Sequence, residues 1–157
     1  MRRSALWLVA SLAVAASACV RTTTDEASGA VDFDIESPTK TGEDWSGKLQ
    51  GQGMYASVTG TMKALVNEGR SAITVTLENA TPGASYTWDV REGKCGQGGG
   101  VVGFASEYSA ITVGNDGKAG TTVTINARLD EAKDYALTVY RSPSDVNDVI
   151  ACGDLDD

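Results

Sequence analysis

The residues best placed to do chemistry lie in one short run, Tyr86-Thr87-Trp88-Asp89-Val90-Arg91-Glu92-Gly93-Lys94-Cys95. Alternate side chains of a strand point to opposite faces, so one set, Tyr86, Trp88 and Val90, is predicted to face the core. Asp89 and Arg91 would then share the polar face. A carboxylate and a guanidinium at this spacing can form a hydrogen-bonded ion pair.

The composition excludes several classes of function. The chain has 157 residues, which is enough for one domain with a hydrophobic core. It contains no histidine, so it lacks the commonest general base and the commonest imidazole ligand of copper and zinc. Its net charge of −8 would repel the phosphates of nucleic acid and the head groups of anionic lipids. We therefore expect no nucleic-acid partner.

The first 18 residues have the features of an export signal. Arg2 and Arg3 precede an apolar run over 5–16, which ends at the small residues that signal peptidases accept, Ala16-Ser17-Ala18. The apolar run is shorter than the roughly twenty residues of a membrane-spanning helix. We expect a signal peptide at 1–18 and an exported mature protein.

Cys19 follows this cleavage site directly. Three cysteines leave one over after a disulfide, and Cys19 is the one outside the predicted folded region. The segment 16–19, Ala-Ser-Ala-Cys, resembles the lipobox of bacterial lipoproteins, in which the cysteine becomes the acylated first residue. This resemblance implies a lipid anchor in the cell envelope, on the periplasmic face or in the outer membrane. The alternative is an ordinary signal peptide that leaves Cys19 unmodified.

The rest of the chain divides at about residue 44. Residues 19–44 are rich in Thr, Asp, Glu and Ser, which predicts a disordered tether. The domain expected at 45–157 contains short β-rich runs, at 54–66, 71–78, 85–92, 108–113, 120–127, 134–141 and 148–152, with a possible further strand at 45–49. Turn residues occur at 67–70, 81–83 and 115–117. Seven or eight such strands predict an all-β antiparallel sandwich or flattened barrel.

Three separated segments of this domain contain recognisable motifs. They are 81–83 (Thr-Pro-Gly), 89–95 (Asp-Val-Arg-Glu-Gly-Lys-Cys) and 149–155 (Val-Ile-Ala-Cys-Gly-Asp-Leu). Together they resemble the Cu/Zn superoxide dismutase family, and most closely its bacterial lipoprotein members. The resemblance covers roughly residues 53–155. It implies a Greek-key barrel and a disulfide between Cys95 and Cys152, and we expect both cysteines to be buried near the barrel edge.

The same resemblance implies that Asp89, Arg91 and Tyr140 stand at copper-ligand positions. A guanidinium has no lone pair to offer and brings positive charge to a cation site. The zinc loop corresponds to the short glycine-rich segment 96–103, and the residue that guides superoxide corresponds to Val149. We therefore expect no metal, no cofactor and no dismutase activity. The alternative is a related enzyme or copper-binding protein with an atypical site.

Two interpretations of the former metal site remain open. Asp89, Arg91 and Tyr140 are expected to form a polar cluster on the outer face of the barrel, either purely structural or functional. The segments 96–103 and 143–148 are candidate recognition loops of a binding module, for an envelope protein or another ligand. We expect the domain to be a monomer.

Other candidate residues carry weaker signals. Met54 and Met62 could in principle contact cuprous copper, but methionines in strand-like sequence more often pack in a core. Asp154, Asp156 and Asp157 are expected to form a solvated acidic tail.

Overall fold

The computed structural model describes residues 42–156. The expected signal peptide, Cys19 and the tether up to residue 41 lie outside the described residues. The described chain is all-β, with two single-turn 3-10 helices, η1 (Gly53–Tyr55) and η2 (Ala105–Glu107). Its strands are β1 (Glu43–Gly51), β2 (Thr59–Asn67), β3 (Arg70–Glu78), β4 (Ser85–Glu92), β5 (Ile111–Thr112), β6 (Ala119–Ile125), β7 (Tyr135–Ser142) and β8 (Asp145–Leu155). Neither helix within 42–156 is long and apolar enough to span a membrane.

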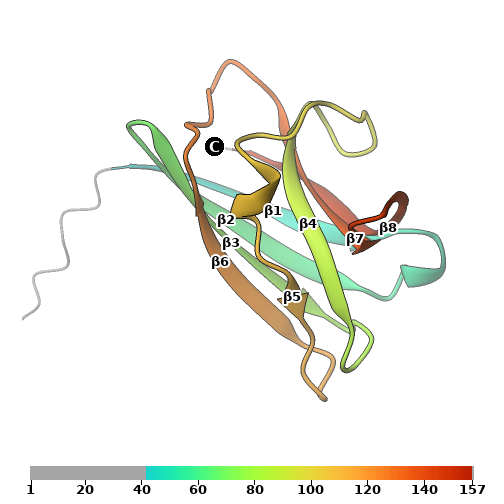
Figure 1. The fold of residues 1–157 in the computed structure, drawn as a ribbon. Coiled ribbons are helices and arrows are strands. Elements are labelled where there is room, and N and C mark those ends of the chain that lie inside the picture. The colour runs from blue at the N-terminus through green and yellow to red at the C-terminus, as the bar shows by residue number, and fades with distance from the viewer. Residues whose placement is uncertain (1–41, 157) are drawn as a thin grey trace, which may run out of the picture. The chain divides into compact units, whose positions relative to one another are not determined.

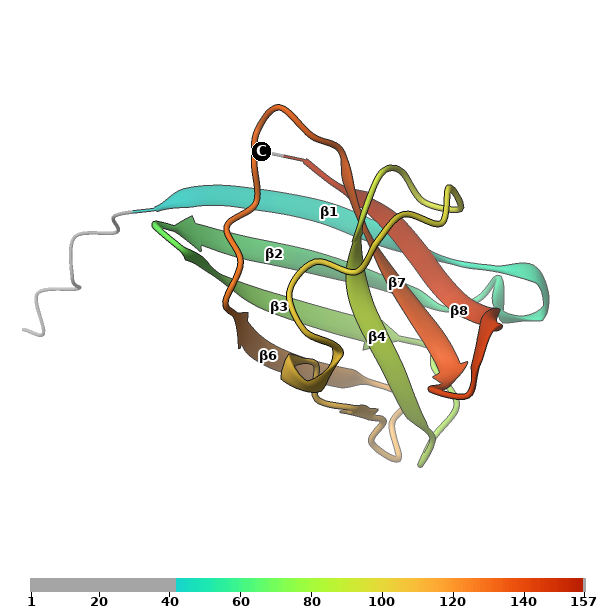
Figure 2. The ribbon, with the colours of Figure 1, turned by 45° about the horizontal axis from the view of Figure 1, so that its top comes forward.

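All eight strands belong to one antiparallel sheet with the order β5-β4-β7-β8-β1-β2-β3-β6. The sheet curls into a nearly closed barrel whose two ends are β5 and β6 (Figures 1 and 2). Strand β3 pairs with β6 rather than with β4, and β4 pairs with β7. Such long connections between neighbouring strands are the mark of a Greek key. The expected all-β antiparallel barrel is confirmed.

Several strand boundaries differ from the predicted ones. β1 begins at Glu43, because Glu43 and Asp44 pair with residues of β2, and so it starts two residues before the strand expected at 45–49. The strand predicted at 54–66 begins only at Thr59, since η1 occupies its start. The strand predicted at 108–113 is reduced to the two residues of β5. The predicted turn at 67–70 is confirmed, with Gly69 in the left-handed region at φ 82°.

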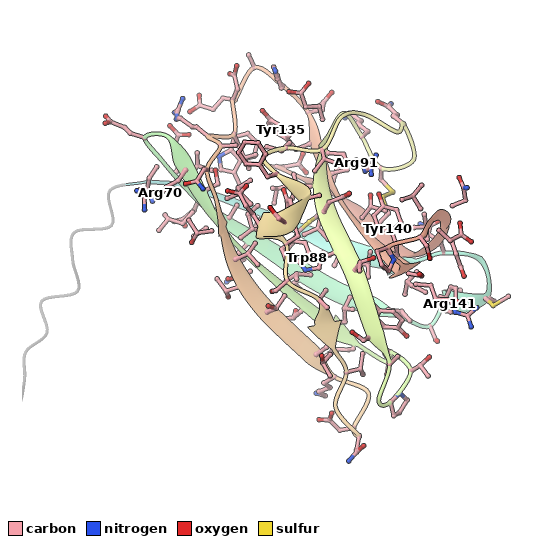
Figure 3. All side chains as sticks on the ribbon, in the orientation of Figure 1. Arg70, Trp88, Arg91, Tyr135, Tyr140 and Arg141 are labelled. Carbon is pink, nitrogen blue, oxygen red and sulfur yellow. A yellow bond between two sulfur atoms is a disulfide. The ribbon has the colours of Figure 1, made fainter. Side chains whose placement is uncertain are left out.

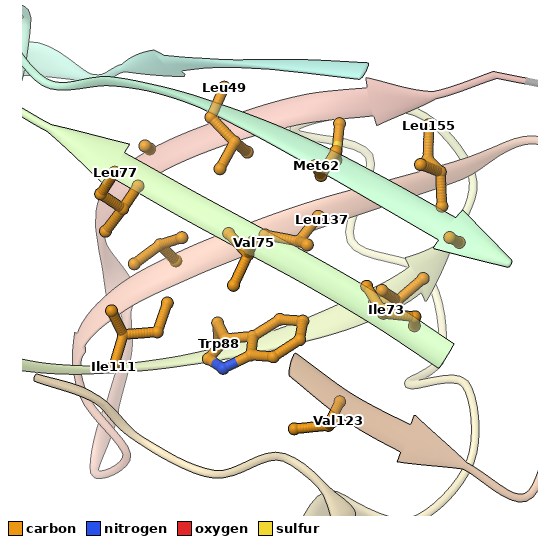
Figure 4. Close-up of a cluster of buried hydrophobic side chains, with 14 of the residues drawn as sticks. Leu49, Met62, Ile73, Val75, Leu77, Trp88, Ile111, Val123, Leu137 and Leu155 are labelled. Carbon is orange, nitrogen blue, oxygen red and sulfur yellow. The ribbon is translucent and has the colours of Figure 1, made fainter. Parts of the chain in front are cut away.

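Apolar side chains fill the barrel interior. The inward set predicted for β4, Tyr86, Trp88 and Val90, is buried. Trp88 points from β4 into the barrel, where it lies among buried residues of the other strands (Figures 3 and 4). Its indole N–H donates to the carbonyl of Ser109 at 2.8 Å, and its ring meets Tyr108 edge-on at 5.1 Å. This packing fixes the inward face of β4 and thereby turns Asp89 and Arg91 outward.

Candidate functional site

Asp89, Arg91 and Tyr140 meet on the outer face of the barrel. The Nε and Nη2 groups of Arg91 each donate to a different carboxylate oxygen of Asp89, both at 3.0 Å. The phenol of Tyr140, on the neighbouring strand β7, donates to Oδ1 of Asp89 at 3.1 Å. The guanidinium carbon of Arg91 lies 5.6 Å from the centre of the Tyr140 ring. The structure therefore forms the expected polar cluster.

The surroundings of the cluster favour one protonation state for two of its members. The hydrogen bond to Asp89 raises the pKa of Arg91, more than burial lowers it. Burial raises the pKa of Tyr140, and the negative charge of Asp89 raises it further. The guanidinium therefore stays charged and the phenol stays protonated, which matches their roles as donors to Asp89.

The glycine-rich segment after β4 turns back along the edge of that strand. The backbone N–H of Glu92 donates to the carbonyl of Gly100 at 2.9 Å, and Val101 forms an isolated bridge with Arg91. Nη1 of Arg91 donates to the carbonyl of Gly99 at 3.2 Å. Arg91 therefore donates hydrogen bonds both to Asp89 and to the returning segment. We call residues 93–101 the glycine loop.

A disulfide fixes the glycine loop to the last strand. Cys95 and Cys152 are bonded, with their Cα atoms 5.7 Å apart, as the family resemblance implied. The backbone N–H of Cys95 also donates to Oδ1 of Asp154 at 2.7 Å. Cys152 is buried, but Cys95 is only half-buried because its loop lies at the surface, so the expectation that both are buried is wrong for Cys95.

The acidic tail is likewise more structured than predicted. The side chain of Asp154 is tied to the glycine loop, and the backbone of Asp156 exchanges two hydrogen bonds with Ser46 of β1. Asp157 lies outside the described residues.

A cavity of about 440 Å³ lies between the glycine loop and the β7–β8 hairpin. Its polar lining comes from Gln52, Arg91, Lys94, Thr138, Tyr140 and Asn147. Its apolar lining comes from Ala136, Val146, Val149 and the disulfide. We call this space the loop cavity. Gly96 and Gly98 of the segment 96–103 also line it, together with Val146 and Asn147 of the segment 143–148, so both segments expected to be recognition loops contribute.

The sequence did not predict all of the residues and strand pairings that form the loop cavity. Residues 145–147, expected in a loop, belong to β8, and the turn is only Pro143-Ser144. The pairing between β7 and β8 shifts register beside Tyr140, since Val139 pairs with Ala151 whereas Tyr140 pairs with Val149. Such a bulge redirects the side chains next to it. No residue pattern in this hairpin marks the bulge, so it was not predicted, nor was the place of Gln52 in the lining.

The residues at the expected copper site do not fit copper. Both carboxylate oxygens of Asp89 accept hydrogen bonds from Arg91, and the guanidinium has no lone pair for a metal. Within residues 42–156, no three of the side chains of His, Cys, Asp and Glu gather as a metal site would require. Met62 is buried in the core and Met54 is 88% exposed, so these methionines do not share a site.

Comparison with known proteins adds no family assignment. No protein-family model matches the chain, and no curated protein matches it significantly. The relation to the superoxide dismutase family therefore stays a prediction that rests on the three sequence segments.

Proposed function

We propose that the mature chain is a non-catalytic, metal-free lipoprotein of the cell envelope, whose superoxide-dismutase-like barrel serves as a structural or binding module. The observation that supports this most is the mutual pairing of Asp89, Arg91 and Tyr140. They stand at the three positions where the family resemblance implies copper ligands. In this chain the three side chains are joined by hydrogen bonds from Arg91 and Tyr140 to Asp89.

Binding a cation at these positions would first require Asp89 to leave Arg91. That step breaks two charge-assisted hydrogen bonds between side chains that are only 14% and 24% exposed. Separating such a part-buried pair costs about 1–3 kcal/mol, before the repulsion between Arg91 and the incoming cation is counted. The cluster therefore opposes a copper site.

The envelope location rests on the first 19 residues together with the disulfide. Residues 1–18 have the pattern of an export signal, and Cys19 occupies the lipobox position. A disulfide between Cys95 and Cys152 fits an oxidising compartment outside the cytoplasm. Both observations favour an exported protein over a cytoplasmic one.

Elemental analysis and a dismutation assay on the mature protein, purified from bacterial envelopes, test the proposal. We expect substoichiometric copper and zinc and no dismutation above a denatured control. One copper per chain together with dismutation would overturn the proposal.

Mass spectrometry of the N-terminal peptide tests the anchor separately. We expect a peptide that begins at an acylated Cys19, and a Cys19→Ser variant that moves to the soluble fraction. An unmodified Cys19 at the mature N-terminus would contradict the lipoprotein assignment and leave the metal result unaffected.

A further inference from the structure

We propose that the loop cavity binds a small carboxylate that carries a short apolar tail. This inference rests on the proposed binding function and names the class of ligand. The volume of the loop cavity, about 440 Å³, lies within the range of small-molecule sites. Its lining combines the cationic side chains of Arg91 and Lys94 with several apolar groups.

The charge of the lining favours an anion. Arg91 and Lys94 are the charged side chains among the described residues that line the loop cavity, and none of those residues carries a carboxylate. This is unusual in a chain with a net charge of −8. Asp89, which accepts hydrogen bonds from the guanidinium of Arg91, is not among the lining residues. An anion inside the cavity would therefore meet positive groups first.

Arg91 is already held in place for such a ligand. A guanidinium has five N–H donors, and three of those in Arg91 are used, two by Asp89 and one by Gly99. At most two N–H groups remain for a ligand, because the Tyr140 phenol also interacts with the guanidinium. Because Asp89, Gly99 and the Tyr140 ring already fix the side chain, binding would cost Arg91 little conformational entropy.

Lys94 supplies a second, adjustable cation. Its side chain is 55% exposed, and its Nζ lies 3.7 Å from Oδ1 of Asp134, which is itself 63% exposed. An exposed pair of this length contributes little to stability. The ammonium can therefore turn from Asp134 toward a bound carboxylate at small cost.

The apolar part of the lining would contact the tail of the ligand. Ala136, Val146 and Val149 line it together with the disulfide. Val146 is 53% exposed, which makes it one of the few large apolar side chains at the surface of the described residues. Covering this patch would remove apolar surface from water and stabilise a complex with an aliphatic chain.

Titration with hexanoate, followed by ¹H–¹⁵N NMR of the mature domain, tests the inference. Three related compounds serve as probes. Hexylammonium reverses the charge of the head group, hexanol removes the charge, and acetate keeps the charge but lacks the tail. We expect hexanoate to shift the amide signals of 94–98 and 146–149 and the Nε–H signal of Arg91. Acetate should bind about tenfold more weakly because it lacks the tail. Hexylammonium should leave these signals in place.

Three variants locate the binding site. Lys94→Gln should raise the Kd for hexanoate about threefold through loss of an exposed charge. Val146→Asp should weaken binding by a similar or larger factor, since it places a negative charge on the apolar wall. Lys118→Gln is the matched control, because Lys118 is 64% exposed and its Nζ lies 3.4 Å from Glu78, but it does not line the cavity. It should leave the Kd unchanged.

Equal binding of hexanoate and hexylammonium, or shifts confined to residues outside the loop cavity, would overturn the inference. So would equal effects of Lys94→Gln and Lys118→Gln, or an absence of shifts up to the solubility limit. Copper content and dismutation are measured on the same samples. A metal-free, inactive protein that does not bind hexanoate would refute the ligand class alone. Stoichiometric copper together with dismutation would refute the proposed function itself.

Discussion

Asp89 receives two hydrogen bonds of 3.0 Å from Arg91, a residue two positions further along the same strand. Side chains two apart on a strand point the same way, so the long arginine folds along β4 to reach its partner. The phenol of Tyr140 completes the cluster from β7. Most of the cluster is thus local in sequence, and single substitutions can separate its parts.

We predict that Asp89→Asn lowers the free energy of unfolding by about 1–3 kcal/mol, because it leaves a part-buried guanidinium without its carboxylate. Urea denaturation measures the change. The double variant Asp89→Asn/Arg91→Met should recover part of the loss. Glu78→Gln, which breaks an exposed pair with Lys118, is the control and should change stability by less than about 0.5 kcal/mol. Equal effects of Asp89→Asn and Glu78→Gln would contradict this prediction.

The disulfide should contribute more than any single hydrogen bond. Its cysteines are separated by 57 positions, and closing a loop of this length stabilises a fold by about 4 kcal/mol in the chain-entropy model. We expect Cys95→Ser/Cys152→Ser to lose about this amount in urea denaturation. The wild-type protein in reducing buffer should lose nearly as much, and an unchanged midpoint in both samples would refute the prediction.

The glycine loop offers a test of close backbone packing. A Cβ atom at Gly99 would collide with the carbonyl of Glu92, whereas one at Gly100 would meet nothing within 4 Å. We expect Gly99→Ala to destabilise the domain by about 1–3 kcal/mol, as overpacked sites do. Gly100→Ala should change stability by less than about 0.5 kcal/mol. Thermal unfolding of both variants checks the difference, and similar midpoints would show that the loop is not packed as described.

Glu107 should make stability depend on pH. Its carboxylate accepts a hydrogen bond from the backbone N–H of Phe104 and two more from Asn126, and these lower its pKa. A carboxyl whose pKa is lower in the folded state stabilises the fold above its unfolded pKa, and the effect is lost as pH falls through the folded value.

The matching experiment compares wild type with Glu107→Gln by thermal unfolding between pH 7 and pH 3. We expect the variant to melt at a lower temperature at pH 7, with a gap that narrows below about pH 4, where an ordinary glutamate protonates. A gap that stays constant or widens on acidification would exclude this role for Glu107.

Sequence reasoning succeeded where the determining interactions are local. The period of two in β4 predicted the burial of Trp88 and the outward pairing of Asp89 with Arg91, and Gly69 marked its turn. The positions of Tyr140 and of the disulfide came from the family resemblance, because both contacts join residues more than fifty positions apart.

What the sequence did not show depends on the assembled barrel. The register shift beside Tyr140 lies inside the β7–β8 hairpin, and the short η1 before β2 is closed by the hydrogen bond from Tyr55 to the carbonyl of Gln52, but no residue pattern marks either feature. The loop cavity depends on both, since it takes Val149 from the shifted strand and Gln52 from the residue before η1. No local pattern distinguishes these residues from an ordinary strand and turn.

The disulfide also has a topological consequence. It closes residues 95–152 into a covalent ring that includes β5, β6 and β7 and most of β8. The three-stranded meander β1–β2–β3 lies outside the ring. It connects two strands of the ring, because β1 pairs with β8 and β3 pairs with β6. One backbone cut beside Phe104, which is 69% exposed, would therefore open the ring without releasing any strand. The nicked barrel would remain a single covalent molecule until a reductant reached Cys95.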